Sequence, residues 1–308
     1  MNDAPRISLG PILYYWPKDQ VLEFYDRIIE STVDIVYLGE TVCSKRTQIG
    51  TDDWLELGEK LVDAGKEVVF STLALVEAES ELKRLRRICG NGRYWVEAND
   101  MGAVHLMVGQ PFVSGHSVNV YNARTLQVLA GQGLKRWVMP LELSFETLAE
   151  MQAARPAGVE TELFVFGRLP LAYSARCFTA RAHNLPKDDC QYRCLDYPDG
   201  LTLSAQDDTR FLVLNGIQTQ SAQTFDLLGE LPRIRELGVD VIRVSPQSRG
   251  TEEVIGIFRQ CLEGELELTE GNRRLQPFMP AGACDGYWFG DAGMDARARL
   301  AAEPSDRG

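Results

Sequence analysis

Three cysteines lie within eighteen residues of this sequence, in the stretch CFTARAHNLPKDDCQYRC that runs from 177 to 194. Twelve residues separate Cys177 from Cys190, and three separate Cys190 from Cys194. A thiolate can act as a nucleophile, as a metal ligand or as a redox partner of another thiol. The spacing therefore raises the question of which of these chemistries the fold makes available.

The elements that must position these thiols alternate between β-rich runs and amphipathic helical stretches. The runs at 33–40 and 240–247 are rich in β-branched residues, and the stretch at 20–31 carries apolar residues at helical spacing. About eight such β/α units imply a parallel sheet. We therefore expect an α/β protein with a (β/α)8 TIM-like barrel, possibly irregular, and a doubly wound open sheet is the alternative. No glycine-rich phosphate loop follows the first strand, which disfavours a dinucleotide-binding fold.

The barrel is expected to form one domain over residues 1–290. A cysteine-bearing insertion is expected near 174–220, because the regular alternation stops there. The segment 291–308, DAGMDARARLAAEPSDRG, is expected to be a disordered tail.

The topology of a β/α barrel sorts the cysteines. Loops that follow the strands gather on one face, and active sites are built there. Cys43 follows a predicted strand, and Cys177, Cys190 and Cys194 follow the strand-like run at 160–171. These four thiols should therefore converge. The other three are expected in less specific places, namely a helix end (Cys89), a helix interior (Cys261) and the C-terminal segment (Cys284).

Four convergent thiols are typical of a metal site, and three possibilities stay open. Zinc takes four thiolates, although its ligands usually include two tight pairs, and here only Cys190 and Cys194 form one. Iron–sulfur clusters also take four thiolates and tolerate wider spacing. The third possibility is that no metal binds. Four cations near the cysteines could offset the charge of a thiolate-bound centre: Arg176, Arg181, Lys187 and Arg193.

Another group of polar residues follows a later predicted strand, in SGHSVNVYNA. Their position on the site-bearing face makes them candidates for substrate binding or catalysis. The candidates are His116, Asn119, Tyr121 and Asn122.

Charged residues lie near other strand ends. Arg243 is a further catalytic candidate, and with Gln247 it could receive an anionic carboxylate. Glu40 and Glu97 could exchange protons, but a capping or ion-pair role is the simpler expectation for them.

The composition excludes several classes of function. The net charge of −12 disfavours binding to nucleic acid, and the 44% hydrophobic content supports a large core. No apolar run reaches the roughly 18 residues that a transmembrane segment needs. No signal peptide is recognisable at the N-terminus, so a cytoplasmic location is expected, where thiols stay reduced and a disulfide framework is improbable.

Several long motifs point to one family: SLGPILYYWPK, DIVYLGETVCSKR, LPLAYSARCFTAR, LNGIQT and CDGYW. Spread from about residue 7 to 289, they closely resemble the UbiU/UbiV type of the collagenase-like peptidase U family, in particular its UbiV members. Those proteins act in ubiquinone biosynthesis.

The resemblance implies a 4Fe-4S cluster held by the family's four cysteines, which match Cys43, Cys177, Cys190 and Cys194. It implies a UbiU-UbiV heterodimer that hydroxylates an aromatic ring anaerobically, without O2, with prephenate as the possible hydroxyl donor. It further implies a UbiT-like lipid carrier that presents polyprenyl-phenol intermediates. The alternative is that this chain is a non-catalytic electron-relay or structural partner of UbiU.

Proteolysis is not expected despite the family's name. The sequence has three histidines and neither a His-Glu-x-x-His helix motif nor a Gly-x-Ser-x-Gly elbow. A role in modifying tRNA or rRNA, as in other members of the family, is a weaker interpretation, because the net negative charge argues against RNA binding.

Overall fold

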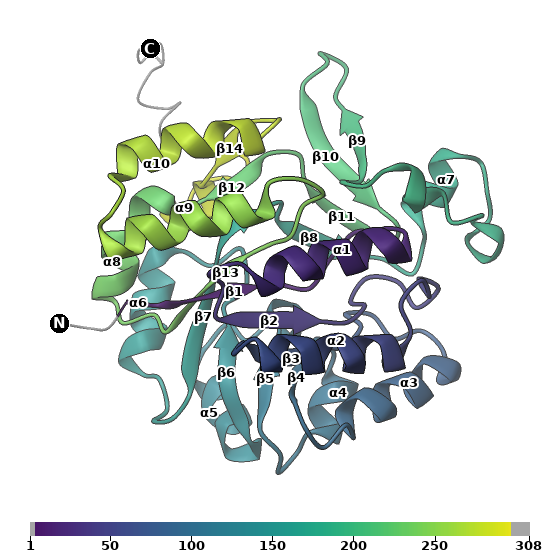
Figure 1. The fold of residues 1–308 in the computed structure, drawn as a ribbon, viewed down its shortest axis with the longest axis horizontal. Coiled ribbons are helices and arrows are strands. Elements are labelled where there is room, and N and C mark those ends of the chain that lie inside the picture. Colours follow the sequence, from purple (N-terminus) through teal and green to yellow (C-terminus); the bar gives the residue numbers. More distant parts are fainter. Residues whose placement is uncertain (1–3, 297–308) are drawn as a thin grey trace.

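Eight parallel strands close into a barrel in the computed structural model, which describes residues 4–296 (Figure 1). The strands follow the order β13-β1-β2-β3-β4-β5-β6-β7, and β7 pairs back with β13. Their bounds are β1 (Arg6–Leu9), β2 (Ile35–Leu38), β3 (Glu67–Ser71), β4 (Trp95–Ala98), β5 (Phe112–Ser114), β6 (Leu134–Val138), β7 (Glu160–Gly167) and β13 (Val241–Val244). This closure confirms the predicted TIM-like barrel and rules out the open sheet.

Helices cover the outside of the barrel. They are α1 (Lys18–Ile29), α2 (Thr51–Asp63), α3 (Glu79–Cys89), α4 (Met101–Leu106), α5 (Ala123–Gln132), α6 (Phe145–Ala153), α8 (Leu231–Glu236), α9 (Thr251–Glu263) and α10 (Leu268–Leu275). In α1 the buried residues Val21, Phe24, Tyr25 and Ile28 recur at helical spacing and form the stripe that packs on the sheet. The outward-facing strand residues Val36 and Leu38 belong to the same core.

The barrel interior is unusually polar. Ile35 and Tyr37 alternate with the outward residues of β2 and pack with other strand residues inside. Four charged side chains share this interior and are almost completely buried: Glu97, Arg136, Glu162 and Arg243. Barrels of this class more often fill the interior with branched apolar side chains, so the charges indicate a specific role for the centre.

The insertion lies between β7 and β12 (Thr224–Asp226). It contains β8 (Pro170–Tyr173), α7 (Phe178–Ala182), the 3-10 helices η2 (Lys187–Asp189) and η3 (Arg193–Asp196), β9 (Leu201–Ser204), β10 (Arg210–Asn215) and β11 (Gln218–Ser221). The four strands form an antiparallel sheet in the order β8-β11-β10-β9. Figure 1 places this sheet and α7 on the side of the barrel toward which β2 points.

The insertion begins earlier than expected. The sequence predicted a start near residue 174, but β8 already begins at Pro170. The run at 160–171, predicted as one strand, breaks after Gly167 into β7 and β8. Gly167 has φ of +131°, and a Cβ there would stand 2.5 Å from the Cβ of Ser245. Both the conformation and the close approach require glycine at this bend.

The two ends of the insertion meet at the barrel. Leu169 N donates to Ser221 Oγ at 2.9 Å, and Ser221 N donates to Leu169 O at 3.0 Å. After this neck, β12 runs antiparallel to β7 and pairs with β14 (Ala283–Cys284).

The folded part of the chain continues past residue 290, where the tail was expected to begin. Asp285 N and Gly286 N both donate to Asp295 O at 3.0 Å, so residues 291–296 fold back onto this region. The rest of the predicted tail, 297–308, lies outside the described residues. No helix within 4–296 has both the length and the hydropathy to cross a membrane.

Candidate functional site

The loop after β2 carries Cys43 and is fixed by a carboxylate. Glu40 Oε1 accepts hydrogen bonds from Val42 N at 2.8 Å and from Cys43 N at 2.9 Å. Gly39, with φ of +125°, makes the turn that starts the loop. Glu40 therefore shapes the loop, as the capping interpretation predicted, and does not face the barrel cavity.

The insertion supplies the other three thiols of the predicted set. Cys177 caps the N-terminus of α7, and its Sγ accepts from Ala180 N at 3.4 Å. Cys190 ends η2, and Cys194 lies in η3. The short helices thus hold the three cysteines on one compact segment.

Cys194 interacts electrostatically with the other three thiols of the predicted set. Burial raises the pKa of Cys194 to about 11, with the charges of Cys43, Cys177 and Cys190 adding to the rise. Cys43 and Cys177 also pack beside the same apolar cluster of Leu13, Val42 and Ile217. The four cysteines form no disulfide in the described part of the chain. The remaining three lie elsewhere: Cys89 at the end of α3, Cys261 in α9 and Cys284 in β14.

The arrangement is looser than a site for one metal ion. Among residues 4–296, no group of three or more His, Cys, Asp or Glu side chains is arranged to hold a metal ion. A single zinc ion would need four ligands close enough to surround it tetrahedrally. A four-iron cluster keeps its cysteine ligands farther apart, because iron and sulfide fill the space between the thiolates.

Arg46 is a buried cation at this site that was not predicted from the sequence. Its side chain is 2% exposed, and it donates to Leu13 O at 2.6 Å and to Asn215 Oδ1 at 2.7 Å. It also approaches the Cys194 thiol, and its charge opposes the rise that burial gives the pKa of Cys43 and Cys194. Within the described residues, Arg46 Nε is buried without a hydrogen-bond partner. Four thiols beside a buried, incompletely paired cation suit an anionic thiolate-bound centre.

The cations expected to offset the charge lie nearer to solvent. Arg176, Arg181 and Arg193 are exposed, and Arg193 Nη1 pairs with Asp196 at 3.4 Å. Lys187 pairs with Glu77. Lys45 instead connects the Cys43 loop to the insertion, because its Nζ donates to Lys187 O at 2.9 Å and to Asp188 Oδ1 at 3.0 Å.

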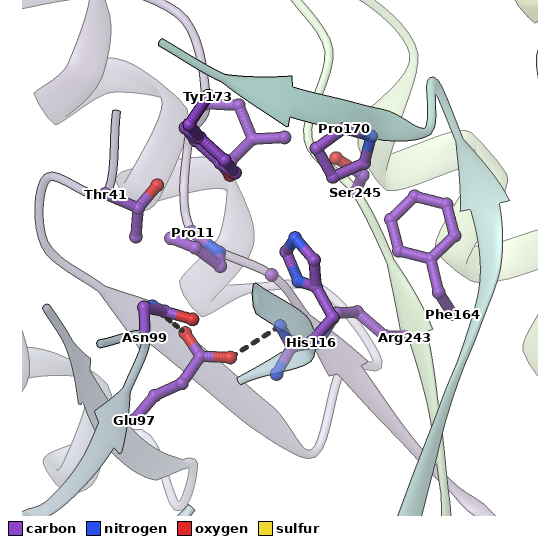
Figure 2. Close-up of a pocket in the computed structure, with 12 residues that line it drawn as sticks. Pro11, Thr41, Glu97, Asn99, His116, Phe164, Pro170, Tyr173, Arg243 and Ser245 are labelled. Carbon is purple, nitrogen blue, oxygen red and sulfur yellow. Dashed lines mark hydrogen bonds and ion pairs between the residues drawn. The ribbon is translucent and has the colours of Figure 1, made fainter. Parts of the chain in front are cut away.

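A cavity lies at the C-terminal mouth of the barrel (Figure 2). It encloses about 370 Å³ including open space at its edge, of which about 20 Å³ admits the centre of a water molecule. Its walls share Leu13 and Tyr173 with the apolar cluster that contacts Cys43 and Cys177. The lining residues are Gly10, Pro11, Leu13, Thr41, Glu97, Asn99, His116, Phe164, Pro170, Tyr173, Arg243 and Ser245.

Arg243 lines the cavity, but two carboxylates already hold it. Its Nε donates to Glu162 Oε1 at 2.6 Å and its Nη1 to Glu97 Oε1 at 2.7 Å (Figure 2 shows the second bond). Gln247 lies outside this cavity, in a groove farther along the rim, and donates to Arg249 O. Arg243 and Gln247 therefore do not share one carboxylate site as expected, and Glu97 is an ion-pair residue as predicted.

His116 is the loop candidate that reaches the cavity. It lies in η1 (His116–Val118), and burial lowers its pKa to about 4, so the ring is neutral at neutral pH. Three unpartnered polar atoms meet at the cavity in the described structure: His116 Nε2, Thr41 Oγ1 and Arg243 Nη2. They could orient a ligand that has few polar groups.

The other three loop candidates do not line the cavity. Tyr121 is 41% exposed, and its hydroxyl bonds to Asn119 and Glu142. Asn122 Oδ1 accepts from Thr125 N at 2.9 Å and caps α5. They follow β5 as predicted, but their side chains bond to neighbouring residues outside the cavity.

Several residues that line the cavity were not predicted from the sequence. Asn99 directly follows β4 and Thr41 lies in the loop after β2, positions that could have identified them. Tyr173 gave no such signal, because it reaches the cavity from β8, whose existence depends on the unforeseen bend at Gly167.

Comparison with known proteins adds a family match. The model of a family described as peptidase family U32 matches residues 20–296. The tRNA hydroxylation protein P1 of Bacillus subtilis (strain 168) is 23% identical over 158 residues, which are 46% of this chain and 35% of that protein. The chain thus spans about a third of the length of this curated relative.

Two solved structures show a weaker likeness. The U32 peptidase Mk0906 has a TM-score of 0.46 and 12% identity, covering 80% of this chain and 94% of that chain. Yersinia pestis DHPS has a TM-score of 0.39 and 11% identity, covering 85% of this chain and 94% of that chain. The barrel assignment rests on the strand pairing alone.

Proposed function

Although this chain belongs to peptidase family U32, we propose that it is not a peptidase but a cluster-bearing subunit of an oxygen-independent hydroxylase. The observation that carries the proposal is the gathering of four thiols and the buried Arg46 beside the barrel-mouth cavity. A relative named as a hydroxylation protein supports the reaction class.

Four cysteines of this chain would hold a 4Fe-4S cluster: Cys43, Cys177, Cys190 and Cys194. When bound, such a cluster passes single electrons, which suits hydroxylation with a donor other than O2. Arg46 offsets the charge of the thiolates, and Leu13 and Tyr173 separate them from the cavity. Reduced thiols of this kind suit the cytoplasm.

The cavity suits an aromatic ring with a hydroxyl group. Phe164, Pro170 and Tyr173 give it apolar walls, while Thr41 and His116 offer polar atoms. Ligand sites commonly combine apolar walls with a few polar groups in this way. Since little of the space admits even water, the β8 segment above the cavity must move for a ring to enter.

Together with the UbiV-type motifs, these features favour a role in ubiquinone biosynthesis. The substrate would be a polyprenyl-phenol presented by a UbiT-like lipid carrier, the partner a UbiU-type subunit in a heterodimer, and the possible hydroxyl donor prephenate. The chain would supply a cluster and a ring-binding cavity to that complex.

The test is anaerobic purification of the chain with its partner, followed by quantitation of iron and sulfide. Single Cys→Ser substitutions at the four positions should lower both contents and abolish anaerobic ubiquinone formation. Cys261→Ser is the matched control, because Cys261 lies in α9 away from the site. Wild-type iron, sulfide and ubiquinone in all four variants would refute the proposal.

Cavity variants separate catalysis from electron relay. Thr41→Val keeps the side-chain shape and His116→Gln keeps a polar group, and both residues line the cavity. Lost ubiquinone formation with full iron content places the chemistry in this chain. Retained formation favours a relay or structural partner of a UbiU-type subunit.

Hydroxylation of tRNA is a second candidate function, favoured by the named relative. The net charge of −12 argues against it, because tRNA binding requires a positive surface. Mass spectrometry of tRNA nucleosides and of quinones from a strain that lacks the chain distinguishes the two. Loss of a hydroxylated nucleoside with unchanged ubiquinone would select tRNA.

A further inference from the structure

We propose that Arg46 is a positioning residue that holds the thiolate-bound centre and raises its reduction potential. The inference rests on the proposed function, because it assumes that the four cysteines bind a cluster. Arg46 acts through the cluster's ligands and would not touch the substrate.

Arg46 is anchored from three directions. Its backbone N donates to Cys43 O at 3.0 Å, which ties it to the first cysteine. Its guanidinium donates to Leu13 O of the barrel and to Asn215 Oδ1 of the insertion. A planar cation held at both terminal nitrogens keeps its Nε–H group in one direction.

Within residues 4–296, the Nε–H group of Arg46 lacks a hydrogen-bond acceptor. Among the described residues Arg46 Nε is buried without a partner, while the side chain lies against Cys194. Glu40 Oε1 stands 3.7 Å from Nη1 and also accepts two backbone N–H groups, so it offsets only part of the charge. Buried polar groups are rarely left unpaired, and an anionic sulfur centre would supply the missing acceptor.

Burial distinguishes Arg46 from the other cations near the thiols. Solvent and salt screen Lys45, whose side chain is 32% exposed, and they screen the exposed Arg181 more strongly. A charge shielded from water acts far more strongly on its neighbours. Arg46 should therefore dominate the local potential at the centre.

Reduction of a cluster adds one negative charge, which a buried cation stabilises. Loss of the Arg46 charge should lower the equilibrium constant for reduction at least about tenfold. For a one-electron couple this is a shift of about 59 mV to lower potential. Hydrogen bonds and charges near the sulfur atoms are established determinants of cluster potentials.

The experiment measures the midpoint potential of the protein reconstituted anaerobically with iron and sulfide. Dithionite supplies the electron, and electron paramagnetic resonance follows the reduced cluster. Arg46→Gln should show the lowered potential and release iron faster in a chelator. Arg46→Lys keeps the charge and should fall between Arg46→Gln and the wild type. Arg181→Gln, which removes an exposed charge from the same insertion, should leave the potential unchanged.

Glu40→Gln decides the question if Arg46→Gln does not fold. The amide oxygen can still accept from Val42 N and Cys43 N, so the loop is kept while the charge that opposes Arg46 is removed. The potential should rise, and an unchanged or lower potential would overturn the inference. A wild-type protein without iron and sulfide would refute the proposed function itself. A loaded wild type with the same potential as Arg46→Gln would overturn the role of Arg46 alone.

Discussion

At the scale of single residues, the charges inside the barrel form one connected network. Glu162 Oε1 accepts from Arg243 Nε and from Ser8 Oγ at 2.6 Å, and Tyr37 bonds to its other oxygen. Arg136 Nη1 donates to Tyr37 at 3.1 Å and continues the network toward the barrel bottom. The network fixes the direction of Arg243 and hence the floor of the cavity.

Glu162→Gln should destabilise the protein by about 3 kcal/mol, because it leaves buried guanidinium groups without their counter-charge. Although burial acts to raise it, Arg243 and Arg136 hold the pKa of Glu162 below its ordinary value of 4.5. Its stabilisation is therefore complete above about pH 4.5 and is lost as the pH falls through the lowered pKa. Urea unfolding at pH 7 and below pH 4.5 should show the difference between variant and wild type shrinking in acid.

Glu263→Gln is the control for Glu162. The Glu263 side chain is 49% exposed and stands 3.9 Å from Arg259, so its loss should change the free energy of unfolding by less than about 0.5 kcal/mol. An equal loss in the free energy of unfolding for the two substitutions would contradict a stabilising role of the buried network.

The His116 ring should stay neutral down to about pH 4, since burial disfavours its charged form. Its folded pKa lies below the ordinary value of 6.5, so its contribution to stability is complete above pH 6.5 and is lost as the pH falls toward 4. Histidine-ring NMR measures this directly, because the chain has three histidines. His116→Asn assigns the resonance, and a midpoint near 6.5 would contradict the burial of the ring.

At the residue scale, the sequence can predict those positions that topology alone decides. The convergence of Cys43 with Cys177, Cys190 and Cys194 follows from the rule that loops after barrel strands share a face. The orientation of Arg46 and the pairing of Arg243 depend on side-chain packing across the barrel, which has no periodicity in the sequence.

At the scale of elements, the eight β/α units could be predicted because each carries its own hydrophobic period. The antiparallel sheet of the insertion could not, since β8 and β11 pair across about fifty residues and the β11 side chains are all polar. The short α4 could not be predicted either, because its six residues are too few to show a helical period.

The turn after β2 gives a test at this scale. Gly39→Ala should cost about 3 kcal/mol or more, because φ is +125° and the new Cβ would stand 2.6 Å from Ser71 O. The loop that carries Cys43 should shift as a result, and iron content should fall. Urea unfolding and iron quantitation measure the two effects.

Gly65→Ala is the matched control for Gly39. Its φ of +81° gives a similar backbone penalty, but no described atom lies within 4 Å of the added Cβ. A loss of about 1 kcal/mol with unchanged iron content is expected. Similar iron contents in both alanine variants would contradict the positioning role of Gly39.

At the scale of the whole molecule, the barrel and the insertion are separable in principle. Because Leu169 and Ser221 are hydrogen-bonded to each other, a Gly-Gly linker can replace residues 170–220 without moving either end. The shortened chain should keep its barrel and its helical circular dichroism. The lost apolar cluster around Leu13 should cost about 2 kcal/mol, or roughly 4–8 °C in Tm.

An unfolded product would contradict this separability. The shortened chain should also fail to retain iron, since three of the four cysteines are removed with the insertion. Iron at the full-length level would contradict the assignment of those cysteines.

The four thiols belong to two different units, one on the barrel and three on the insertion. A cluster bound by all four would cross-link the barrel and the insertion. Oxygen, which destroys exposed clusters, would break this cross-link, and proteases would then cleave the insertion first. Cofactor loss in air would thus be visible as selective cleavage between β7 and β12, well before the barrel itself unravels.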